Sequence, residues 1–418
     1  MLFKKALEYI DSLPNCGFER YGVSGVLALL EKLKNPQKKL NFIHIAGTNG
    51  KGSVSTFCAK VLEENKLKVG LYISPYVVGF AERIQINGEY IDEDEFVVLF
   101  EKLKNLVEIL NKDGIYLTSF DFVTVLAIEY FYEKKCDFVV FEVGMGGRLD
   151  STNVIDAKIS IITHIDYDHV KELGGKEGSI LNIAKEKAGI LKKGGFCVID
   201  SNQYDEVLQF LKLKCEENKI EYKTSYKAEK VCCEADGSCF FFDGVLYKIK
   251  LLGQHQVQNA MTAITALIKL KIKTDVIKKG LFNAFIPARF EILKKDPLIV
   301  LDGAHNPNGA ESLKKTLSLF SNPIKIGVFS VINTKDYFKI LKVFVGIFDR
   351  IILTKMQDER AVDIELLEKK AKDLNLNFSV SSSFKEAVYL AESLANKDGM
   401  VVIFGSLYFA AQVRKLFM

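Results

Sequence analysis

The sequence has no long apolar run, little excess charge and few clustered cysteines. Lysine and arginine total 57 against 53 acidic residues, so the formal net charge is only +4 over 418 residues. So small an excess argues against a track for nucleic acid, although a cleft that holds anions can still be locally basic. No uncharged apolar run reaches the roughly 20 residues that a membrane-spanning helix needs. We therefore expect neither a nucleic-acid partner nor a membrane partner.

The eight cysteines are scattered along the chain, and only Cys232, Cys233 and Cys239 cluster. Two of these are adjacent, no histidine is near, and the spacing fits no zinc template. Apolar side chains in a hairpin are the simpler interpretation, beside a metal or disulfide role. The N-terminal stretch MLFKKALEYIDSL contains acids and lacks a small-residue cleavage site, so it does not resemble a secretory signal. We expect a cytoplasmic protein.

Apolar residues make up 48% of the chain and charged residues 26%, a balance typical of globular proteins. Short apolar runs alternate with stretches of helical periodicity, which predicts an α/β fold with mainly parallel sheets. The predicted strands of the first half are Phe42–Ala46, Val69–Ile73, Phe138–Val143, Ile159–Thr163 and Phe196–Ile199.

Two later segments define the predicted domain organisation. Residues 230–252 have Asp-Gly turns between apolar runs, which indicates antiparallel hairpins, and we expect them to close the edge of the first domain. The stretch IPARFEILKKDP contains two of the seven prolines, and alternation of strands and helices restarts after it. We therefore predict a P-loop ATPase-like domain at residues 1–290 and a smaller doubly wound α/β domain at residues 291–418.

The most informative stretch is a glycine-rich turn, Gly47–Ser53, directly after the strand Phe42–Ala46. A strand that runs into such a turn and then into a helix, expected to open at about Ser53, directs backbone N–H groups at a phosphate. Lys51 is placed to bridge the β- and γ-phosphates, and the Ser53 hydroxyl is placed to reach Mg²⁺ or a phosphate oxygen. The spelling differs from the standard phosphate loop because Gly52 separates the lysine from the serine. The turn predicts nucleotide binding, and a generic glycine-rich turn is the alternative.

The spelling GTNGKGS resembles the phosphate loop of the Mur ligase superfamily. Further landmarks follow in chain order and are similar to those of the folylpolyglutamate synthase family, in particular the stretch FEVGMGGRLDSTN at residues 141–153. The others are YISP at 72–75, DYDH at 166–169, EKAGI at 186–190, QHQVQNA at 254–260, Ala288-Arg289, LDGAHNP at 301–307 and GSLY at 405–408. The resemblance covers nearly the whole chain. It departs at Tyr76, where the family usually has histidine.

The resemblance implies an ATP-dependent ligase that adds L-glutamate to dihydropteroate or to a folate through an acyl phosphate. Such an enzyme needs positioning, Mg²⁺ and cations that neutralise the transferring phosphoryl group. It implies ATP contacts from Thr48, Asn49, Gly50, Lys51, Gly52 and Ser53, and from Asn259, Arg289, Asp302 and His305. His305 could instead order its own loop. The family is mostly monomeric, and we expect a monomer.

The resemblance also implies that Ser74, Glu142 and His169 bind Mg²⁺. Each follows or closes a predicted strand, so the three could converge at one sheet edge. The alternatives are a turn for Ser74, a strand-end salt bridge for Glu142 and a loop cap for His169. An acid in the run VVFEVGMGG is costly to bury unless it binds something, which favours the metal role of Glu142.

Lys187 matches a family lysine that CO₂ carbamoylates, and the resemblance implies a catalytic role for it beside Lys51 and His169. The alternative is that Lys187, in the last turn of a helix before Gly189, only interacts with the helix dipole.

For the folate, the resemblance points to three groups of residues. They are Gly17, Phe18 and Glu19; Thr118, Ser119, Phe120 and Asp121; and Leu149, Asp150 and Ser151. The ring of Phe120 could lie against a pterin or belong to the core. Dihydrofolate synthase and folylpolyglutamate synthase activities both remain open, and we favour an enzyme with both.

Two other functions are possible. A cell-wall Mur ligase generally has a UDP-binding domain before the phosphate loop, and 46 residues before Gly47 are too few for one. A regulatory module that binds ATP without turnover needs the loop but not the other landmarks.

Overall fold

The computed structural model describes residues 2–14, 22–175 and 178–418, which form two compact units. Unit 1 comprises Met1–Ser74, Ala81–Ala228 and Gln258–Ala284. Unit 2 comprises Pro75–Phe80, Glu229–Val257 and Phe285–Met418.

Unit 1 is built on a sheet whose described strands have the order β4-β3-β2-β5-β1-β6-β7-β8. Strands β2, β5, β1, β6, β7 and β8 run parallel to one another, and β3 and β4 add an antiparallel edge beside β2. Their bounds are β1 Phe42–Ala46, β2 Val69–Tyr72, β3 Ile84–Ile86, β4 Glu89–Tyr90, β5 Phe138–Glu142, β6 Ile159–Ile162, β7 Phe196–Ile199 and β8 Glu221–Thr224. Strand β1 is buried along its whole length, as expected of a central parallel strand covered on both faces.

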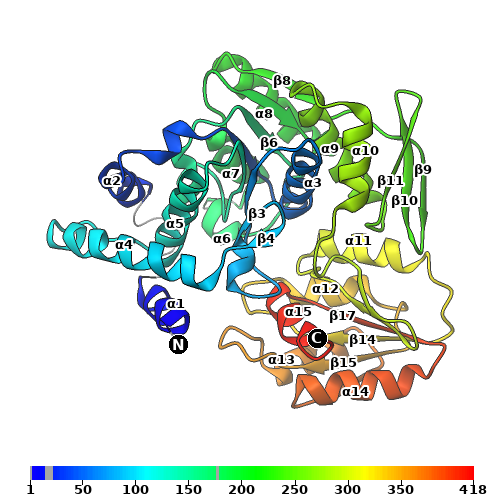
Figure 1. Ribbon diagram of the computed structural model, residues 1–418. Helices are drawn as coiled ribbons and strands as arrows, with labels where there is room; N and C mark the ends of the chain where they lie inside the picture. The colour runs from blue at the N-terminus through cyan, green and yellow to red at the C-terminus, as the bar shows by residue number, and fades with distance from the viewer. Residues whose placement is uncertain (1, 15–21, 176–177) are drawn as a thin grey trace. The chain divides into compact units, whose positions relative to one another are not determined.

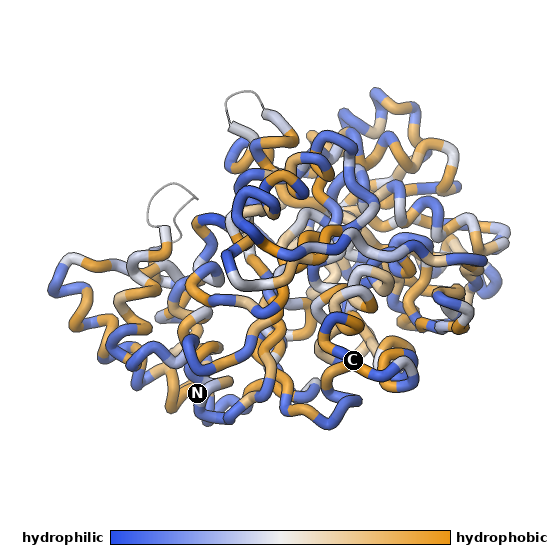
Figure 2. The backbone as a smooth tube through the Cα atoms, turned by 90° about the horizontal axis from the view of Figure 1, so that it is seen from above, coloured by the Kyte–Doolittle hydropathy of each residue, from blue (hydrophilic) through white to orange (hydrophobic). Residues whose placement is uncertain are grey.

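Helices surround this sheet (Figure 1). They are α1 Leu2–Ser12, α2 Ser24–Lys32, α3 Lys51–Glu64, α4 Glu93–Lys112, α5 Ser119–Glu133, α6 Val170–Leu173, α7 Ile180–Lys187, α8 Asp205–Glu217, α9 Gln254–Lys269 and α10 Thr274–Asn283, with short 3-10 turns at Pro36–Lys39, Phe80–Arg83, Ser151–Val154 and Ala188–Ile190. Helix α3 packs against β1, β2 and β5, and α10 packs on α3. Helices α1, α2, α4 and α5 pack against one another, and α5 also packs on β2. Along the helices, hydrophilic and hydrophobic residues alternate in the manner of amphipathic helices (Figure 2).

Unit 2 contains a second sheet with the described order β12-β13-β17-β14-β15-β16, in which only β12 is antiparallel to its neighbour. Its strands are β12 Glu291–Lys294, β13 Leu298–Leu301, β14 Lys325–Phe329, β15 Arg350–Thr354, β16 Phe378–Ser381 and β17 Met400–Phe404. Its helices are α11 Pro307–Leu317, α12 Tyr337–Val343, α13 Ile364–Asp373, α14 Phe384–Ala395 and α15 Leu407–Arg414.

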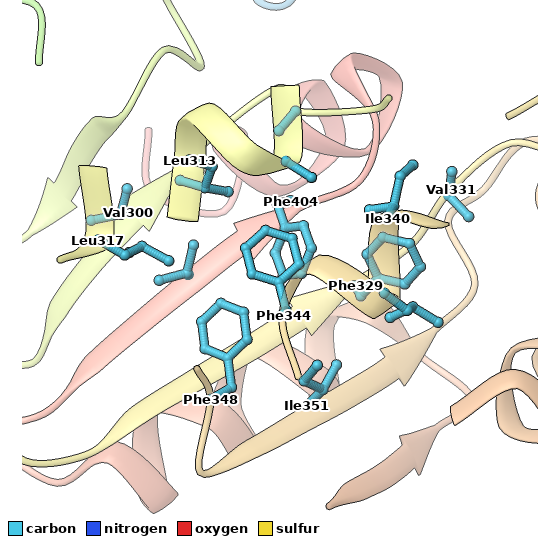
Figure 3. Close-up of a cluster of buried hydrophobic side chains, with 14 of the residues drawn as sticks. Val300, Leu313, Leu317, Phe329, Val331, Ile340, Phe344, Phe348, Ile351 and Phe404 are labelled. Carbon is cyan, nitrogen blue, oxygen red and sulfur yellow. The ribbon is translucent and has the colours of Figure 1, made fainter. Parts of the chain in front are cut away.

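One face of the second sheet carries a cluster of phenylalanines (Figure 3). The ring of Phe344 lies 4.6 Å from that of Phe404, and Phe348 stacks on Phe404 at 5.6 Å. Phe329 approaches Phe404 from β14 at 5.1 Å. This packing of the segment that follows α12 against the sheet gives unit 2 a hydrophobic core of its own.

The predicted α/β fold with a smaller doubly wound α/β part is confirmed. Two local predictions need correction. Residues 229–249 form hairpins as predicted, but β9 Glu229–Glu234, β10 Gly237–Phe242 and β11 Val245–Ile249 pair with one another in a separate sheet and do not extend the sheet of unit 1. Helix α3 begins at Lys51 and not at Ser53, because Gly50 already has the left-handed backbone that precedes the first turn.

Of the helices in the described part of the chain, none combines the length and the hydropathy required to cross a membrane.

Candidate functional site

The strand order of unit 1 brings four chain segments to one sheet edge. Strand β1 lies between β5 and β6, and β2 lies on the other side of β5, all parallel. Their carboxyl ends lead into the glycine-rich loop, Ser74, Glu142 and the segment after Ile162. The carboxyl edge of such a sheet is where α/β proteins bind ligands.

The loop between β1 and α3 requires glycine at two positions. Gly47 has φ +155°, and a Cβ there would come 1.8 Å from Thr163 Oγ1. Gly50 has φ +88°, and a Cβ there would come 2.3 Å from Asn259 Oδ1. The predicted nucleotide-binding residue Asn259 therefore lies directly against the loop. Ser53 is buried in the first turn of α3.

Two lysine amino groups meet at one carbonyl of this loop. Lys51 Nζ lies 3.2 Å from Gly47 O and 3.4 Å from Thr48 O. Lys187 Nζ, from the last residue of α7, donates to the same Gly47 O at 2.8 Å. Lys187 is only 5% exposed. Its amino group therefore contacts the phosphate loop. A lysine that only neutralised the dipole of its own helix would not need this contact.

Glu142 ends β5 and is 4% exposed. Its Oε2 accepts the backbone N–H of Ser74 at 3.3 Å, and a Cβ on Gly52 would lie 3.7 Å from the same oxygen. The carboxylate thus lies beside the N-terminal turn of α3, where the helix dipole favours negative charge.

Ser74 and Glu142, two of the three predicted metal ligands, are therefore brought together. The third, His169, stands at the N-cap of α6 with φ 51°, and its Nδ1 is 4.0 Å from Glu172 Oε2. Within the described residues there is no cluster of three or more His, Cys, Asp and Glu side chains suited to a metal ion. The predicted set includes a serine, and a carboxylate and a hydroxyl fit a hard cation such as Mg²⁺.

The loop after β5 braces the helix that carries Lys187. Arg148 pairs with Glu186 of α7 at 2.9 Å, and its backbone N–H donates to Glu186 O at 2.8 Å. Asn153 Nδ2 donates to Arg148 O and to Gly189 O. These contacts hold the C-terminal end of α7 against the loop, and with it the position of Lys187.

Two of the three predicted folate groups lie together. Thr118 caps α5 in a capping box with Asp121, and Asp121 Oδ1 accepts Ser151 Oγ at 2.5 Å. Phe120 is half-buried, with its ring on the backbone of Gly144, where a Cβ would come 2.6 Å from Cζ. The hydrogen bond between Asp121 and Ser151 thus connects the start of α5 to the turn at Ser151–Val154. Ser119 opens α5, and Leu149 is half-buried beside Gly22. Gly17, Phe18 and Glu19 lie outside the described residues.

Asp150 belongs to a buried polar chain that the sequence did not predict. Its Oδ2 accepts Met145 N at 2.9 Å, and its Oδ1 accepts Thr152 Oγ1 at 2.5 Å. Because the Thr152 hydroxyl donates to Asp150, it accepts from His44 Nε2, 2.9 Å away. Burial raises the pKa of Asp150 and lowers that of His44 to about 3, with Lys192 contributing to the shift of His44.

The remaining predicted nucleotide residues, Arg289, Asp302 and His305, gather in unit 2 at the carboxyl end of β13. Asp302 accepts the N–H groups of Phe290 at 2.9 Å and Ala304 at 2.8 Å. Desolvation raises its pKa, and the charge of Arg289 opposes this shift. The Arg289 guanidinium packs on Gly303, where a Cβ would come 2.4 Å from Nη1. His305 Nδ1 is 2.7 Å from Gly303 O.

Tyr76, the departure from the family pattern, also lies in unit 2. Its ring is 5.9 Å from that of Phe80.

Sequence reasoning missed His164, which follows β6 and contacts the phosphate loop through its backbone carbonyl. The only signal available was its place after a predicted strand at the same sheet edge as the loop.

Comparison with known proteins gives two family models over most of the chain. The Mur ligase middle domain matches residues 45–267, and the Mur ligase glutamate ligase domain matches residues 288–407.

Full-length relatives are similar to the chain as well. The dihydrofolate synthase/folylpolyglutamate synthase of Bacillus subtilis is 34% identical, with 94% of each chain covered. The folylpolyglutamate synthase of Lacticaseibacillus casei is also 34% identical, over 99% of this chain and 98% of that protein. Among solved structures, Mycobacterium tuberculosis folylpolyglutamate synthase complexed with ADP and AMPPCP superimposes with a TM-score of 0.90 at 28% identity, covering 100% of this chain and 98% of that one.

Proposed function

The chain belongs to the folylpolyglutamate synthase family of Mur ligases, and from this premise we propose that it attaches L-glutamate to dihydropteroate and to the γ-carboxylate of folates at the expense of ATP. The observation that carries the proposal is the sheet edge of unit 1. There the phosphate loop, two lysine amino groups and a buried carboxylate meet.

The reaction has two steps. A carboxylate oxygen of the pteroate or folate attacks the γ-phosphorus of ATP, and the bond from phosphorus to the bridging oxygen breaks to release ADP. The amine of glutamate then attacks the acyl carbon, phosphate leaves with the carbon–oxygen electron pair, and the nitrogen loses a proton. The loop N–H groups and Lys51 stabilise the charge that spreads over the transferring phosphoryl group.

We assign Mg²⁺ to Ser74, Glu142 and His169. The contact between Ser74 and Glu142 at the N-terminal turn of α3 supports the first two ligands. A bound magnesium ion supplies neutralisation of phosphate charge at this place. Here Glu142 acts as a fixed anion, held by Ser74 N–H in a setting where burial makes an unpaired carboxylate costly.

We assign a carbamate to Lys187, formed when its neutral amine attacks CO₂ and releases a proton. Burial of Nζ and its contact with Gly47 O support a role at the phosphate loop. The resulting anion would be an oxygen ligand next to the phosphates.

For the nucleotide we retain Thr48, Asn49, Gly50, Lys51, Gly52, Ser53 and Asn259 in unit 1, and Arg289, Asp302 and His305 in unit 2. The packing of Asn259 on Gly50 supports this assignment for unit 1. The grouping of Arg289 with Asp302 supports it for unit 2.

We propose Phe120 as a pterin contact, because its ring is half-buried and does not belong to the fully buried core. Leu149 is half-buried beside Gly22, and we propose it as a folate contact as well. Asp121, Asp150 and Ser151 then act mainly by shaping the folate loop through their hydrogen bonds.

Two equally similar relatives are named differently, one for both activities and one for folylpolyglutamate synthase alone. We propose both activities here. The test incubates the protein with ATP, Mg²⁺, glutamate and either dihydropteroate or tetrahydrofolate, and reads the products by mass. A product one glutamate heavier in each reaction is expected. Phosphate release without a pterin would instead indicate an ATP-binding module that is no ligase.

We further propose a cytoplasmic monomer, in keeping with a reaction that consumes ATP. Light scattering coupled to size-exclusion chromatography checks the oligomeric state. A cell-wall ligase is not favoured, because both relatives above act on folates by name.

A further inference from the structure

The segment after β6 is hydrogen-bonded to the phosphate loop. The carbonyl of His164 accepts Thr48 N at 2.8 Å and Asn49 N at 3.2 Å. The Thr48 hydroxyl donates to Asp166 O and accepts from Asp166 N, both at 3.0 Å. Four hydrogen bonds thus connect two residues of the loop to the backbone of His164 and Asp166. A movement of that backbone therefore shifts the phosphate loop, and with it the start of α3 that follows the loop.

The side chains of the same two residues hold this backbone in place. His164 Nδ1 contacts Asn202 O, and Nε2 lies 3.8 Å from Asp166 Oδ2. Both side chains are only about one-seventh exposed, at 15% and 14%. Both ring nitrogens therefore face oxygen acceptors, and only the imidazolium has two N–H groups to satisfy them.

The other oxygen of Asp166 is also engaged. Its Oδ1 accepts Tyr167 N at 2.7 Å and Tyr204 OH at 3.1 Å. The carboxylate is therefore fixed in place by a backbone group and by a side chain from a different segment. The ion pair acts between two ordered groups, which reduces the entropy lost in forming it.

The titratable groups near His164 come from two segments. Asp166 lies on its own segment, and Asp200 lies after β7, where it accepts Asn202 N at 2.8 Å and Gln258 Nε2 at 2.9 Å. The ring of Tyr204 lies 6.1 Å from the imidazole. Burial lowers the pKa of His164, but Asp166, Asn202 O and Asp200 outweigh it, so the pKa is raised above its ordinary value. Burial likewise opposes ionisation of Asp166, but His164 and the hydrogen bonds lower its pKa overall.

We propose that His164 and Asp166 are positioning residues for the nucleotide: their ion pair fixes the backbone that holds Thr48 and Asn49, and the loop binds nucleotide more weakly once the imidazolium loses its proton. This inference rests on the proposed nucleotide binding at Gly47–Ser53. It adds a regulator of that site which neither touches the substrate nor takes part in phosphoryl transfer.

The direction of the pH effect follows from the charge state. A group whose pKa is raised in the folded protein contributes its stabilising contact below that pKa and loses it as pH rises through it. Asp166 stays ionised throughout the neutral range because its pKa is lowered. Nucleotide affinity should thus be highest in mildly acidic buffer and fall toward alkaline pH.

The test measures ADP affinity by calorimetry from pH 6.5 to pH 9 at fixed Mg²⁺ for four proteins. These are the wild type, His164→Gln, Asp166→Asn and the control Lys214→Gln, which removes an exposed ion pair with Glu217 in the same unit. At pH 6.5 the wild type and the control should bind ADP about threefold to fivefold more tightly than either variant. At pH 9 all four should agree. Ionisation of ADP itself is common to the four proteins and cancels in the comparison.

Two further readouts separate positioning from simple stabilisation. The KM for ATP should rise in the variants while the KM for glutamate stays unchanged. With only five histidines in the chain, the imidazole signal of His164 can be assigned by its loss in His164→Gln, and its titration in the wild type should follow the ADP affinity.

An equal pH dependence in the wild type and both variants would overturn the inference. A wild type that titrates His164 below its ordinary pKa would also overturn it, even if His164→Gln does not fold, because this readout needs no variant that binds. A wild type that binds no ADP at any pH would instead remove the proposed function, and the inference with it.

Discussion

Two lysines at the phosphate loop touch the same carbonyl oxygen yet have different surroundings. Lys51 is half-buried at the start of α3, whereas Lys187 is 5% exposed at the end of α7. A half-buried ammonium can still follow a moving phosphoryl group, while a fully buried amine is costly to keep charged. This contrast supports a phosphate contact for Lys51 and a modified role for Lys187.

Lys51→Ala should abolish turnover and leave thermal stability nearly unchanged. Loss of about 3 kcal/mol of transition-state stabilisation lowers the rate more than a hundredfold. Lys60→Ala, on the same helix but paired with Glu63, is the control and should keep normal activity. Steady-state kinetics and a melting curve check both. A Lys51→Ala enzyme of near-normal activity would remove the phosphate-loop assignment.

Lys187→Arg should be inactive, because a guanidinium cannot form a carbamate. The activity of the wild type should fall in buffer stripped of bicarbonate and recover when it is added. A short-chain acid in excess should partly restore Lys187→Ala by replacing the missing carboxylate. A role as helix-dipole partner predicts the opposite, with arginine tolerated and alanine costing about 1 kcal/mol of stability. An active Lys187→Arg enzyme that ignores CO₂ therefore contradicts the carbamate, but not the ligase.

Glu142→Gln keeps the size of the side chain and removes its charge. It should raise the Mg²⁺ concentration needed for half-maximal activity and lower the maximal rate, because the proposed oxygen ligand becomes neutral. Magnesium titrations of the variant, the wild type and the surface control Glu63→Gln provide the measurement. If the variant needs no more Mg²⁺ than the wild type, Glu142 is a structural acid.

Among the helices and strands, the junction from β1 through the loop to α3 combines a left-handed backbone with tight packing. Gly50 has φ +88°, and a Cβ there would clash with Asn259 of α9. Gly194 has nearly the same backbone, with φ +90°, but a Cβ there would meet nothing within 4 Å. Substituting alanine at both glycines therefore distinguishes the free-energy cost of a left-handed backbone, present at both, from the cost of a steric clash, present only at Gly50.

Gly194→Ala should lower the free energy of unfolding by about 1 kcal/mol, the cost of a side chain in the left-handed region, and leave the KM for ATP unchanged. Gly50→Ala should cost more stability and also raise the KM for ATP, because Asn259 must move away from the loop. Denaturant unfolding and kinetics on both variants check this. Equal effects of the two substitutions would show that the contact with Asn259 is unimportant.

At the scale of the whole molecule, stability depends on a histidine in the core of unit 1. His44 lies in the fully buried strand β1 and donates to Thr152, so a second proton would go to Nδ1. Within the described residues Nδ1 has no hydrogen-bond partner. The folded protein therefore holds His44 neutral, with a pKa of about 3, while the unfolded chain takes up a proton near the ordinary value of 6.5.

Below pH 6.5 the unfolded state therefore binds one more proton at this position than the folded state, and unfolding becomes easier as pH falls. The contribution of His44 should approach about 1.4 kcal/mol per pH unit until the folded pKa is reached. Chemical unfolding of the wild type and of His44→Gln from pH 7 to pH 4 measures it. The variant should lose stability less steeply, and parallel curves would contradict the assignment.

The fold class, most strands and the place of the phosphate loop could be predicted from the sequence alone, because each depends on residues close together in the chain. The run FIHIA predicts a buried strand, and GTNGKGS predicts the turn and helix after it. The many landmarks in order also identified the family. Errors were local: the start of α3, and the hairpins from Glu229 that form their own sheet.

Which strands are neighbours, and what the side chains contact, could be learned only from the folded chain. The position of β1 between β5 and β6 brings Glu142 and His164 to the loop although they are far apart in sequence. Asp121, a predicted folate residue, accepts a hydrogen bond from Ser151, and His164 holds Thr48 through a backbone carbonyl that every residue has. Strand order and such contacts follow from packing over the whole unit, so no short stretch of sequence contains them.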